Sequence, residues 1–223
     1  MLKVITLLKR RPGLSVEEFQ ARWRKVHADL AAGVAGVRRY VQSHALLQGY
    51  QKGELIYDGI GEVWFDSFDA FDAAAASPEF GIASRDLSEF TDLSRTVVMP
   101  VDVHVIKDGA IPEGAVKNIE FVNRRPGIAL DVFRRYWREV HGPIASRIAV
   151  VRRYEQNHVK AAVYAISGSV PFDGLAITWF GSTAEMKRGT TTPEYAITRA
   201  DEPNFLPDGH LPIIITREHV IIG

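Results

Sequence analysis

Cysteine is absent from the 223 residues, which excludes disulfides, thiolate nucleophiles and cysteine-ligated metals. Net charge is absent too, because 27 basic side chains balance 27 acidic ones, leaving no electrostatic footprint for nucleic acid or for a membrane surface. The apolar run at the start, Val4 to Leu8, has only five residues. It is too short to span a bilayer or to form a signal-peptide core. We therefore expect a cytoplasmic protein with no nucleic-acid partner and no membrane partner.

Several catalytic signatures are missing as well. The sequence has no Gly-x-Gly-x-x-Gly or Gly-x-x-x-x-Gly-Lys-Ser/Thr phosphate loop, and no His-Glu-x-x-His or other clustered metal ligands. A Gly-x-Ser-x-Gly nucleophile elbow is also lacking. These absences favour a small-molecule site that works through His, Tyr and Arg, with no metal and no cofactor.

An internal repeat dominates what is present. Residues 10–13, Arg-Arg-Pro-Gly, recur at 124–127, and this offset of 114 gives 17 identities over the 35 positions from 10 to 44. One extra residue then shifts the offset to 115, which aligns His104 with His219. Such a register indicates a duplication. We predict two domains, residues 1–109 and 115–223, joined by a turn-rich linker.

Each half predicts the order β-α-β-β-α-β. In the first half we expect strands at 4–8, 37–44, 60–65 and 97–106, a helix after a Ser15–Glu18 capping box, and a second helix at 68–76. In the second half Ala129 replaces the capping serine. This order matches the ferredoxin-like unit, whose sheet has helices on one face only.

The bare faces of two such sheets need a partner. The sequence therefore predicts an α+β fold in which two ferredoxin-like units pack sheet to sheet as a single-chain α+β barrel. We expect a folded, pseudo-dimeric monomer. A homodimer formed through the remaining edges or helices stays open.

The two copies keep one polar row on the second strand of each half. Alternate residues of a strand share a face, and one face is identical in both copies: Arg38, Tyr40, Gln42 and His44 match Arg152, Tyr154, Gln156 and His158. On the other face Val41 has become Glu155 and Ser43 has become Asn157. The retained row indicates a binding or catalytic role, and a solvent-exposed or purely structural row is the alternative.

The first helix places His27 one turn after Trp23 on an apolar stripe, and His141 after Trp137 in the second copy. This spacing fits a packed core histidine, or an imidazole that moves a proton beside an apolar cavity. The acidic Asp29, two residues beyond His27, is expected to raise the pKa of that histidine and make it the poorer base. His104 and His219 alternate with valines near strand ends, which favours a structural role.

The combined motifs resemble the EthD family. They are Arg-Arg-Pro-Gly at 124–127, Phe-Arg-Arg-Tyr-Trp-Arg-Glu-Val-His-Gly-Pro at 133–143, Arg-Arg-Tyr-Glu-Gln-Asn-His at 152–158, and the later Asp-Gly, Trp-Phe and Pro-Glu-Tyr. The first half follows the same pattern but has His-Ala-Asp where the second has His-Gly-Pro. The resemblance implies the dimeric α+β barrel superfamily.

The resemblance also implies site residues. A related lactone isomerase is thought to use a helix histidine and a strand-two tyrosine, which correspond here to His141, Tyr154, His27 and Tyr40. The surrounding positions are expected to bind substrate: His158, His44, Arg152, Arg38, Gln156, Gln42, Trp137 and Trp23. Because Gly142-Pro143 keeps the family pattern, His141 and Tyr154 are expected to form the more competent pair.

The leading interpretation is a cofactor-independent lyase or isomerase that acts on a small aromatic or lactone carboxylic acid in catabolism. Histidine would move the proton, tyrosine would donate to a developing oxyanion, and arginine would hold the carboxylate. One alternative is a non-catalytic carrier or sensor of an apolar small molecule. A further alternative is a haem- or oxygen-dependent oxidoreductase, although the Gly-x-x-Asp-Gly haem motif of one related class is not met.

Overall fold

The computed structural model describes residues 1–223 and divides them into two compact units. Unit 1 comprises Met1–Val101 and Thr216–Gly223, and unit 2 comprises Asp102–Ile215. The units therefore follow the sequence repeats except at the strand that ends each repeat. The last part of that strand belongs to the other unit in both cases.

The unit 1 sheet has β3 at its centre. Antiparallel ladders join β3 to β1 and to β2, β1 to β4, and β2 to β8. The strands are β1 (Leu2–Leu8), β2 (Arg39–Ala45), β3 (Gly59–Phe65), β4 (Val97–Lys107) and β8 (Ile213–Ile222). β4 enters unit 1 through its first five residues and β8 through its last part.

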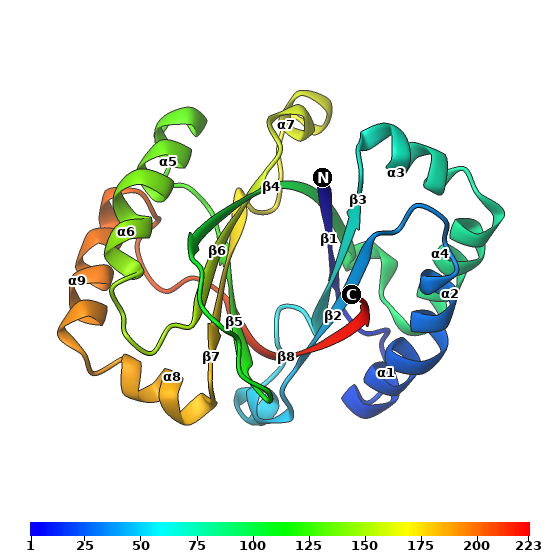
Figure 1. Cartoon of the computed structure of the whole chain (residues 1–223), viewed down its shortest axis with the longest axis horizontal. Helices are drawn as coiled ribbons and strands as arrows, with labels where there is room; N and C mark the ends of the chain where they lie inside the picture. Colours follow the sequence, from blue (N-terminus) through cyan, green and yellow to red (C-terminus); the bar gives the residue numbers. More distant parts are fainter. The chain divides into compact units, whose positions relative to one another are not determined.

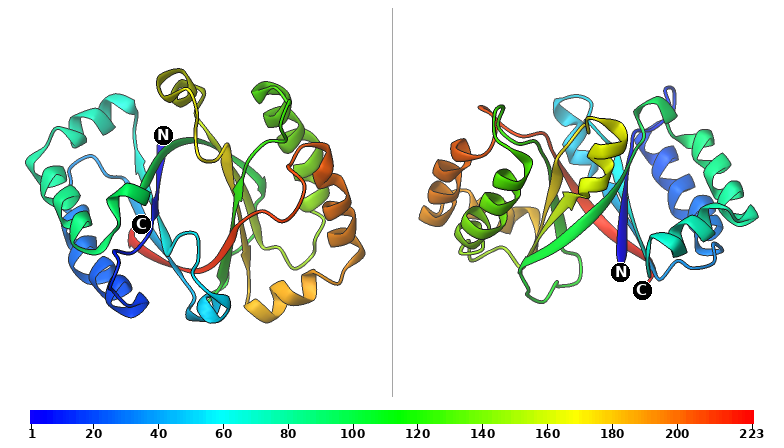
Figure 2. Two further views of the ribbon diagram at one scale, coloured as in Figure 1. Left: turned by 180° about the vertical axis from the view of Figure 1, so that it is seen from behind. Right: turned by 90° about the horizontal axis from the view of Figure 1, so that it is seen from above.

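The helices of unit 1 cover one face of this sheet (Figures 1 and 2). They are α1 (Val16–Arg22), the π-helical turn Trp23–His27, α2 (Ala28–Ala32), α3 (Phe68–Ala75) and α4 (Pro78–Phe90), with short 3₁₀ turns at Leu47–Lys52 and Leu93–Arg95. The predicted capping box is confirmed, because Ser15 accepts from the Glu18 backbone and the Glu18 side chain bonds back to the Ser15 backbone. α1, the π-helical turn and α2 form one continuous helix.

Unit 2 repeats the arrangement. Its sheet contains β5 (Val116–Val122), β6 (Arg153–Val159) and β7 (Gly174–Phe180), with β7 antiparallel to both neighbours. Its helices are α5 (Leu130–Tyr136), the π-helical turn Trp137–His141, α6 (Gly142–Ala145), α7 (Ala161–Ser167), α8 (Thr183–Gly189) and α9 (Pro193–Asp201), followed by a 3₁₀ turn at Glu202–Asn204. No side chain caps the helix that follows Ala129.

Each ferredoxin-like unit has a helix before its last strand that was not predicted. The expected helix at 68–76 is followed by the separate α4, and α8 is likewise followed by α9. Both added helices begin with Pro at the first helical position after a Ser77 or Thr192 cap, whose oxygen accepts a backbone N–H. This is a strong helix-start signal, and the sequence prediction missed it.

The fold class is α+β, with two ferredoxin-like units in one chain, as predicted. Within unit 1 the strands are hydrogen-bonded in the order β4-β1-β3-β2-β8, and within unit 2 β7 lies between β5 and β6. β4 and β8 each pass from one unit into the other. No helix is long and apolar enough to cross a membrane.

Candidate functional site

The first helix of unit 1 widens at the point where it carries Trp23 and His27. In this π-helical turn the Ala28 N–H bonds to the Trp23 carbonyl. Gln42 on β2 donates through Nε2 to the same carbonyl at 2.8 Å. π-Helical turns are rare and occur often at functional sites. The turn and the amide that braces it fix where the indole and the imidazole point.

His27 is held by a carboxylate. Its Nδ1 lies 3.2 Å from Asp86 Oδ2 on α4, and Arg22 pairs with the other oxygen of Asp86. Both His27 and Asp86 are buried. Burial lowers the pKa of His27, while the bond to Asp86 opposes that shift. A neutral imidazole that donates Nδ1–H to Asp86 keeps its lone pair on Nε2, as a general base requires.

Tyr40 on β2 is fixed by two donors. Trp23 Nε1 and Gln42 Nε2 donate to the Tyr40 hydroxyl at 3.1 and 3.0 Å. The hydroxyl oxygen therefore accepts twice and keeps its own hydrogen to donate. Burial raises the pKa of Tyr40 to about 12, so the phenol stays protonated at neutral pH. Tyr40 is a hydrogen-bond donor and not a base.

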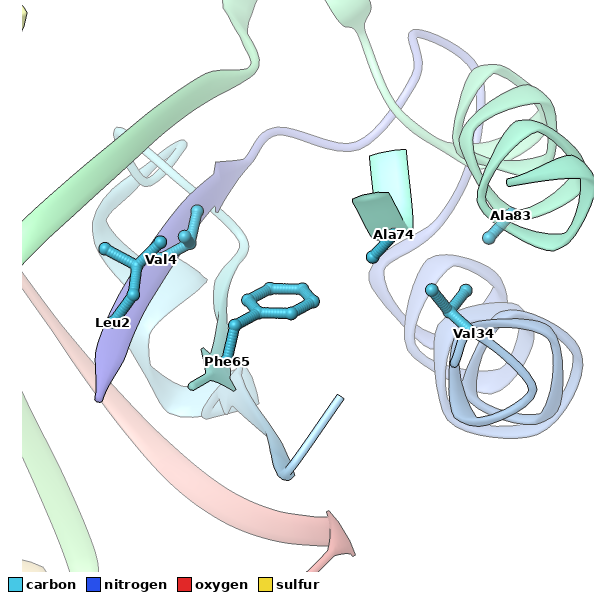
Figure 3. Close-up of a cluster of buried hydrophobic side chains, with 6 residues drawn as sticks. All are labelled: Leu2, Val4, Val34, Phe65, Ala74 and Ala83. Carbon is cyan, nitrogen blue, oxygen red and sulfur yellow. The ribbon is translucent and has the colours of Figure 1, made fainter. Parts of the chain in front are cut away.

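His27 and Tyr40 both line a cavity of about 310 Å³ between the helices and the sheet of unit 1. Part of its apolar wall is visible in Figure 3, where Phe65 extends from the sheet towards Val34, in the turn after α2, and Ala83 on α4. No Asp, Glu, Lys or Arg lines the cavity. An apolar pocket with a few convergent polar groups is the usual form of a small-molecule site.

The other members of the polar row lie elsewhere in unit 1. His44 stacks on Trp23 with ring centroids 4.4 Å apart, and its Nε2 lies 3.0 Å from Gln42 Oε1. Burial lowers the pKa of His44 to about 3, so this imidazole is neutral and donates to Gln42. His219 of β8 meets His44 edge to face at 4.7 Å. His44 is not among the residues that line the cavity.

Both arginines of the row lie at the surface. Arg38 pairs with Asp66 and Arg152 with Glu185, and all four side chains are largely or partly exposed. Arg38 precedes the first residue of β2, so the alternation of the strand does not extend to it. The unit 1 cavity therefore contains no arginine to hold a carboxylate.

Unit 2 carries the same atoms in the same places. His141 Nδ1 lies 2.9 Å from Asp201 Oδ2, and Trp137 Nε1 and Gln156 Nε2 donate to the Tyr154 hydroxyl at 3.2 and 3.1 Å. Gln156 also braces the π-helical turn, at 2.7 Å from the Trp137 carbonyl. Burial lowers the pKa of His141 and raises that of Tyr154.

The stacked histidine recurs in unit 2 as well. His158 lies parallel to Trp137 at 4.5 Å and bonds to Gln156 Oε1 at 3.1 Å, and burial lowers its pKa to about 3. His104 meets His158 edge to face at 4.7 Å. In unit 1 the edge-on histidine is His219, which comes from the second repeat. In unit 2 it is His104, which comes from the first repeat.

The carboxylate partners of the two histidines were not found from the sequence. Asp86 and Asp201 are related by the offset of 115 that already aligns His104 with His219. Applying that offset to the acidic residues would have found them. The expected role of Asp29 is wrong: its side chain is exposed, and the carboxylate that acts on the pKa of His27 is Asp86.

No group of three or more His, Cys, Asp or Glu side chains is placed to hold a metal ion. The fold and the repeated His–Asp and Tyr–Trp–Gln groups define a tandem ferredoxin-like protein with the same buried side-chain arrangement in each unit. The EthD domain family matches residues 11–94 and 125–208, once in each repeat. The chain therefore belongs to the EthD domain family.

Solved structures of the same fold span nearly the whole chain. An anthrone oxidase-like protein covers 99% of this chain and 93% of its own, with 13% identity and a TM-score of 0.61. A proposed monooxygenase from Lactobacillus acidophilus NCFM covers 98% and 94%, with 9% identity and a TM-score of 0.60. A proposed chlorite dismutase covers 98% and 94%, with 12% identity and a TM-score of 0.55. No curated protein matches the sequence.

Proposed function

We propose that unit 1 is a cofactor-independent proton-transfer site, an isomerase or lyase, for a small neutral carbonyl compound such as a lactone or an aromatic ketone. One observation carries the proposal: a carboxylate-held imidazole and a phenol hydroxyl both line one apolar cavity of about 310 Å³. A carboxylic acid, expected from the sequence, finds no cationic partner among the lining residues. A buried carboxylate without one would be costly.

The roles follow from the hydrogen bonds. His27 Nε2 takes the proton from the carbon next to the carbonyl, and the electron pair of that C–H bond moves into the C=O group. Tyr40 donates its hydroxyl hydrogen to the oxygen as negative charge develops there. Where the substrate has a carbon–carbon double bond one carbon further on, the intermediate is a dienolate, and the imidazolium, stabilised by Asp86, returns the proton to its far carbon, which completes an isomerisation. In a lyase, the enolate electron pair would instead form a carbon–carbon double bond as the bond from the next carbon to a leaving oxygen breaks, and the imidazolium would give its proton to that oxygen.

One chain supplies every group that the proposal needs. His27, Asp86, Tyr40, Trp23 and Gln42 all belong to the first repeat. The part of β8 that pairs with β2 comes from the same polypeptide. The proposal therefore requires no second copy of the protein and no metal or cofactor.

The test is deuterium exchange of carbonyl probes in D₂O, followed by proton NMR, with 2-tetralone and δ-valerolactone as the probes. The wild-type protein is expected to accelerate exchange at the carbon next to the carbonyl. His27→Ala should lower that rate by about two to four orders of magnitude, the usual size of general acid–base catalysis. Tyr40→Phe should also slow exchange, because its donor is lost.

Asp29→Asn is the matched control, since Asp29 is an exposed acid on the same helix. It should leave the rate unchanged. An exchange rate that is the same in wild type, His27→Ala and buffer would contradict the proposal. If the probes nevertheless bind to His27→Ala, Tyr40→Phe and Asp29→Asn as they bind to wild type, the carrier or sensor would be favoured. Oxygen consumption with either probe would favour an oxygenase that uses the same deprotonation.

A further inference from the structure

The two units surround the same His–Asp and Tyr–Trp–Gln groups with different side chains. On the first strand of each repeat, Val4 and Thr6 line the unit 1 cavity. The offset of 114 places Asn118 and Glu120 at these positions in unit 2. Both replacements put hydrogen-bond acceptors where unit 1 has a methyl-bearing side chain.

The helix side of the space has changed in the same way. Ser84 and Leu87 on α4 line the unit 1 cavity, and the offset of 115 places Arg199 and Glu202 at these positions. Arg199 lies in the last turn of α9, which ends at Asp201, and Glu202 begins the following 3₁₀ turn. Arg199 Nη1 forms an ion pair with Glu202. The sheet wall and the helix wall have thus both become polar.

Strand register brings these groups to Tyr154. In the unit 2 sheet Thr178 pairs across the strands with both Tyr154 and Asn118, and Glu120 pairs with Ala176 in the next hydrogen-bonded step. Directly paired residues share a face of the sheet. The Tyr154 hydroxyl therefore lies on the same face as the Asn118 amide and the Glu120 carboxyl.

Exposure shows that solvent reaches this face. Six of the seven residues of β5 are buried, and Glu120 is the exception. β7 also has a single exception, Thr178. The corresponding residues of unit 1, Thr6 and Val63, are partly exposed because they line a cavity. The same two positions being accessible in unit 2 indicates a recess at the same place.

Asn118 supplies an acceptor with no partner. Its side chain is 9% exposed, and its Nδ2 donates to Glu120 Oε1 at 2.9 Å. Its Oδ1 is buried without any hydrogen-bond partner. Such an orphaned buried acceptor is unfavourable unless a donor satisfies it. A bound donor would do so.

Charge in the recess argues against an anionic ligand. Glu120 and Glu202 act on each other and on Tyr154, and Arg199 is the cation beside them. Burial raises the pKa of Glu202 to about 7 and also raises the pKa of Glu120. A carboxylate ligand would add a third negative group. An ammonium ligand would meet the guanidinium of Arg199, which already neutralises Glu202.

We propose that unit 2 holds a second ligand site, distinct in chemistry from the unit 1 cavity, for a neutral small molecule with two neighbouring hydroxyl groups. One hydroxyl donates to Glu120 and the other to Asn118 Oδ1, which lie side by side in the recess. Tyr154 can donate to the oxygen of either hydroxyl. The site rests on the unit 2 residues alone and does not depend on the function proposed for unit 1.

The test measures binding of catechol to the full chain by calorimetry, with toluene, benzoate and benzylamine as comparison ligands. Binding of catechol, unlike binding of the other three, is expected to depend on Glu120 and Asn118. Glu120→Thr and Asn118→Val install the residues found at the matching positions of unit 1. Each should weaken catechol binding about ten- to a hundredfold, the usual effect of losing a hydrogen bond to a charged or buried group.

Two controls keep the result interpretable. Asp131→Asn changes an exposed acidic residue of unit 2, and it should leave catechol affinity unchanged. Glu120→Gln keeps the size of the side chain, should fold like the wild type, and should still weaken catechol. Catechol affinity within twofold of wild type in both Glu120 variants would overturn the proposal. Binding of toluene, benzoate or benzylamine that Glu120→Gln weakens as much as it weakens catechol binding would also overturn it.

Discussion

The two units share the His–Asp and Tyr–Trp–Gln groups but differ in the side chains around them. In unit 1, Tyr40 and the His27–Asp86 pair line an apolar cavity without any charged side chain. In unit 2, the same group types stand beside Glu120 and Glu202. The atoms that can move or hold a proton are the same in both copies, whereas the surrounding walls are not. Duplication has thus preserved the hydrogen-bonded His, Tyr, Trp and Gln groups and altered the side chains around them.

The largest expected effect concerns the carboxylate behind each histidine. Asp86→Asn removes the charge that stabilises an imidazolium at His27, so exchange of 2-tetralone should fall about a hundredfold or more. Asp201→Asn is the matched change in unit 2 and should leave that rate within about twofold. Equal losses in the two variants would show that the units do not differ in the substrate they admit.

The pH dependence of the exchange rate in Asp86→Asn tests the role of Asp86 independently of the size of that rate. In the wild type, the bond to Asp86 raises the pKa of His27 against the lowering effect of burial. Losing the carboxylate should therefore lower that pKa further. The acidic limb of the residual exchange rate should move to lower pH. A limb that moves to higher pH, or stays in place, would remove Asp86 from this role.

Glu202 should make stability depend on pH in unit 2. Its pKa is raised from 4.5 to about 7 in the folded protein, so the folded state binds the proton more tightly than the unfolded state. Its contribution is fully present below about pH 4.5 and is lost as pH rises through 7. The wild type should therefore lose about 2–3 kcal/mol of unfolding free energy between pH 4.5 and pH 8, and Glu202→Gln, which does not titrate, should not show this loss.

Urea unfolding at pH 4.5 and at pH 8 measures this difference. Leu87→Met serves as the control, because Leu87 is the matching residue of unit 1 and does not titrate. The free-energy difference between Leu87→Met and wild type should be the same at both pH values. A Glu202→Gln curve parallel to wild type would show that this carboxyl is not shifted.

The glutamine that braces each π-helical turn should matter equally in both units. Gln42→Leu removes the donor to the Trp23 carbonyl and to the Tyr40 hydroxyl, and Gln156→Leu does the same in unit 2. Each should lower the free energy of unfolding by about 1–3 kcal/mol, because two buried acceptors lose one hydrogen bond each and the Nε2–H of His44 or His158 loses its acceptor. A cost confined to one unit would mean that the two centres are not built alike.

The smallest expected effect is at the helix starts. Ser15 caps its helix and Ala129 does not. Ser15→Ala should cost about 1 kcal/mol. Ala129→Ser should gain less than that, because the third helical residue is Val132 and cannot complete a capping box. Thermal melts of both variants check the difference.

Periodicity and repetition were sufficient to predict the core of each unit. The resemblance to the EthD family implied that a helix histidine and Tyr40 belong together, and the structure gives them one cavity in unit 1. The Ser15–Glu18 capping box predicted where the first helix of unit 1 begins. These are local signals, fixed by neighbours in the chain.

Contacts between distant segments could not be predicted in the same way. Asp86 lies 59 residues from His27, on a helix whose start was not recognised. His44 was expected to bind substrate, but its ring is engaged by Trp23 and Gln42. Alternation gives the face of a residue and not what covers that face. Only the fold decides whether helix, cavity or solvent lies opposite.

The passage of β4 and β8 between units has a consequence for cutting the chain. Residues 1–109 alone would lack the strand end that carries His219, and residues 115–223 alone would lack the one that carries His104. Neither fragment contains a complete sheet. Expressed separately, the fragments should be poorly folded, and mixing them should restore structure by complementation. A gene split at the linker would therefore encode two obligate halves and not two independent proteins.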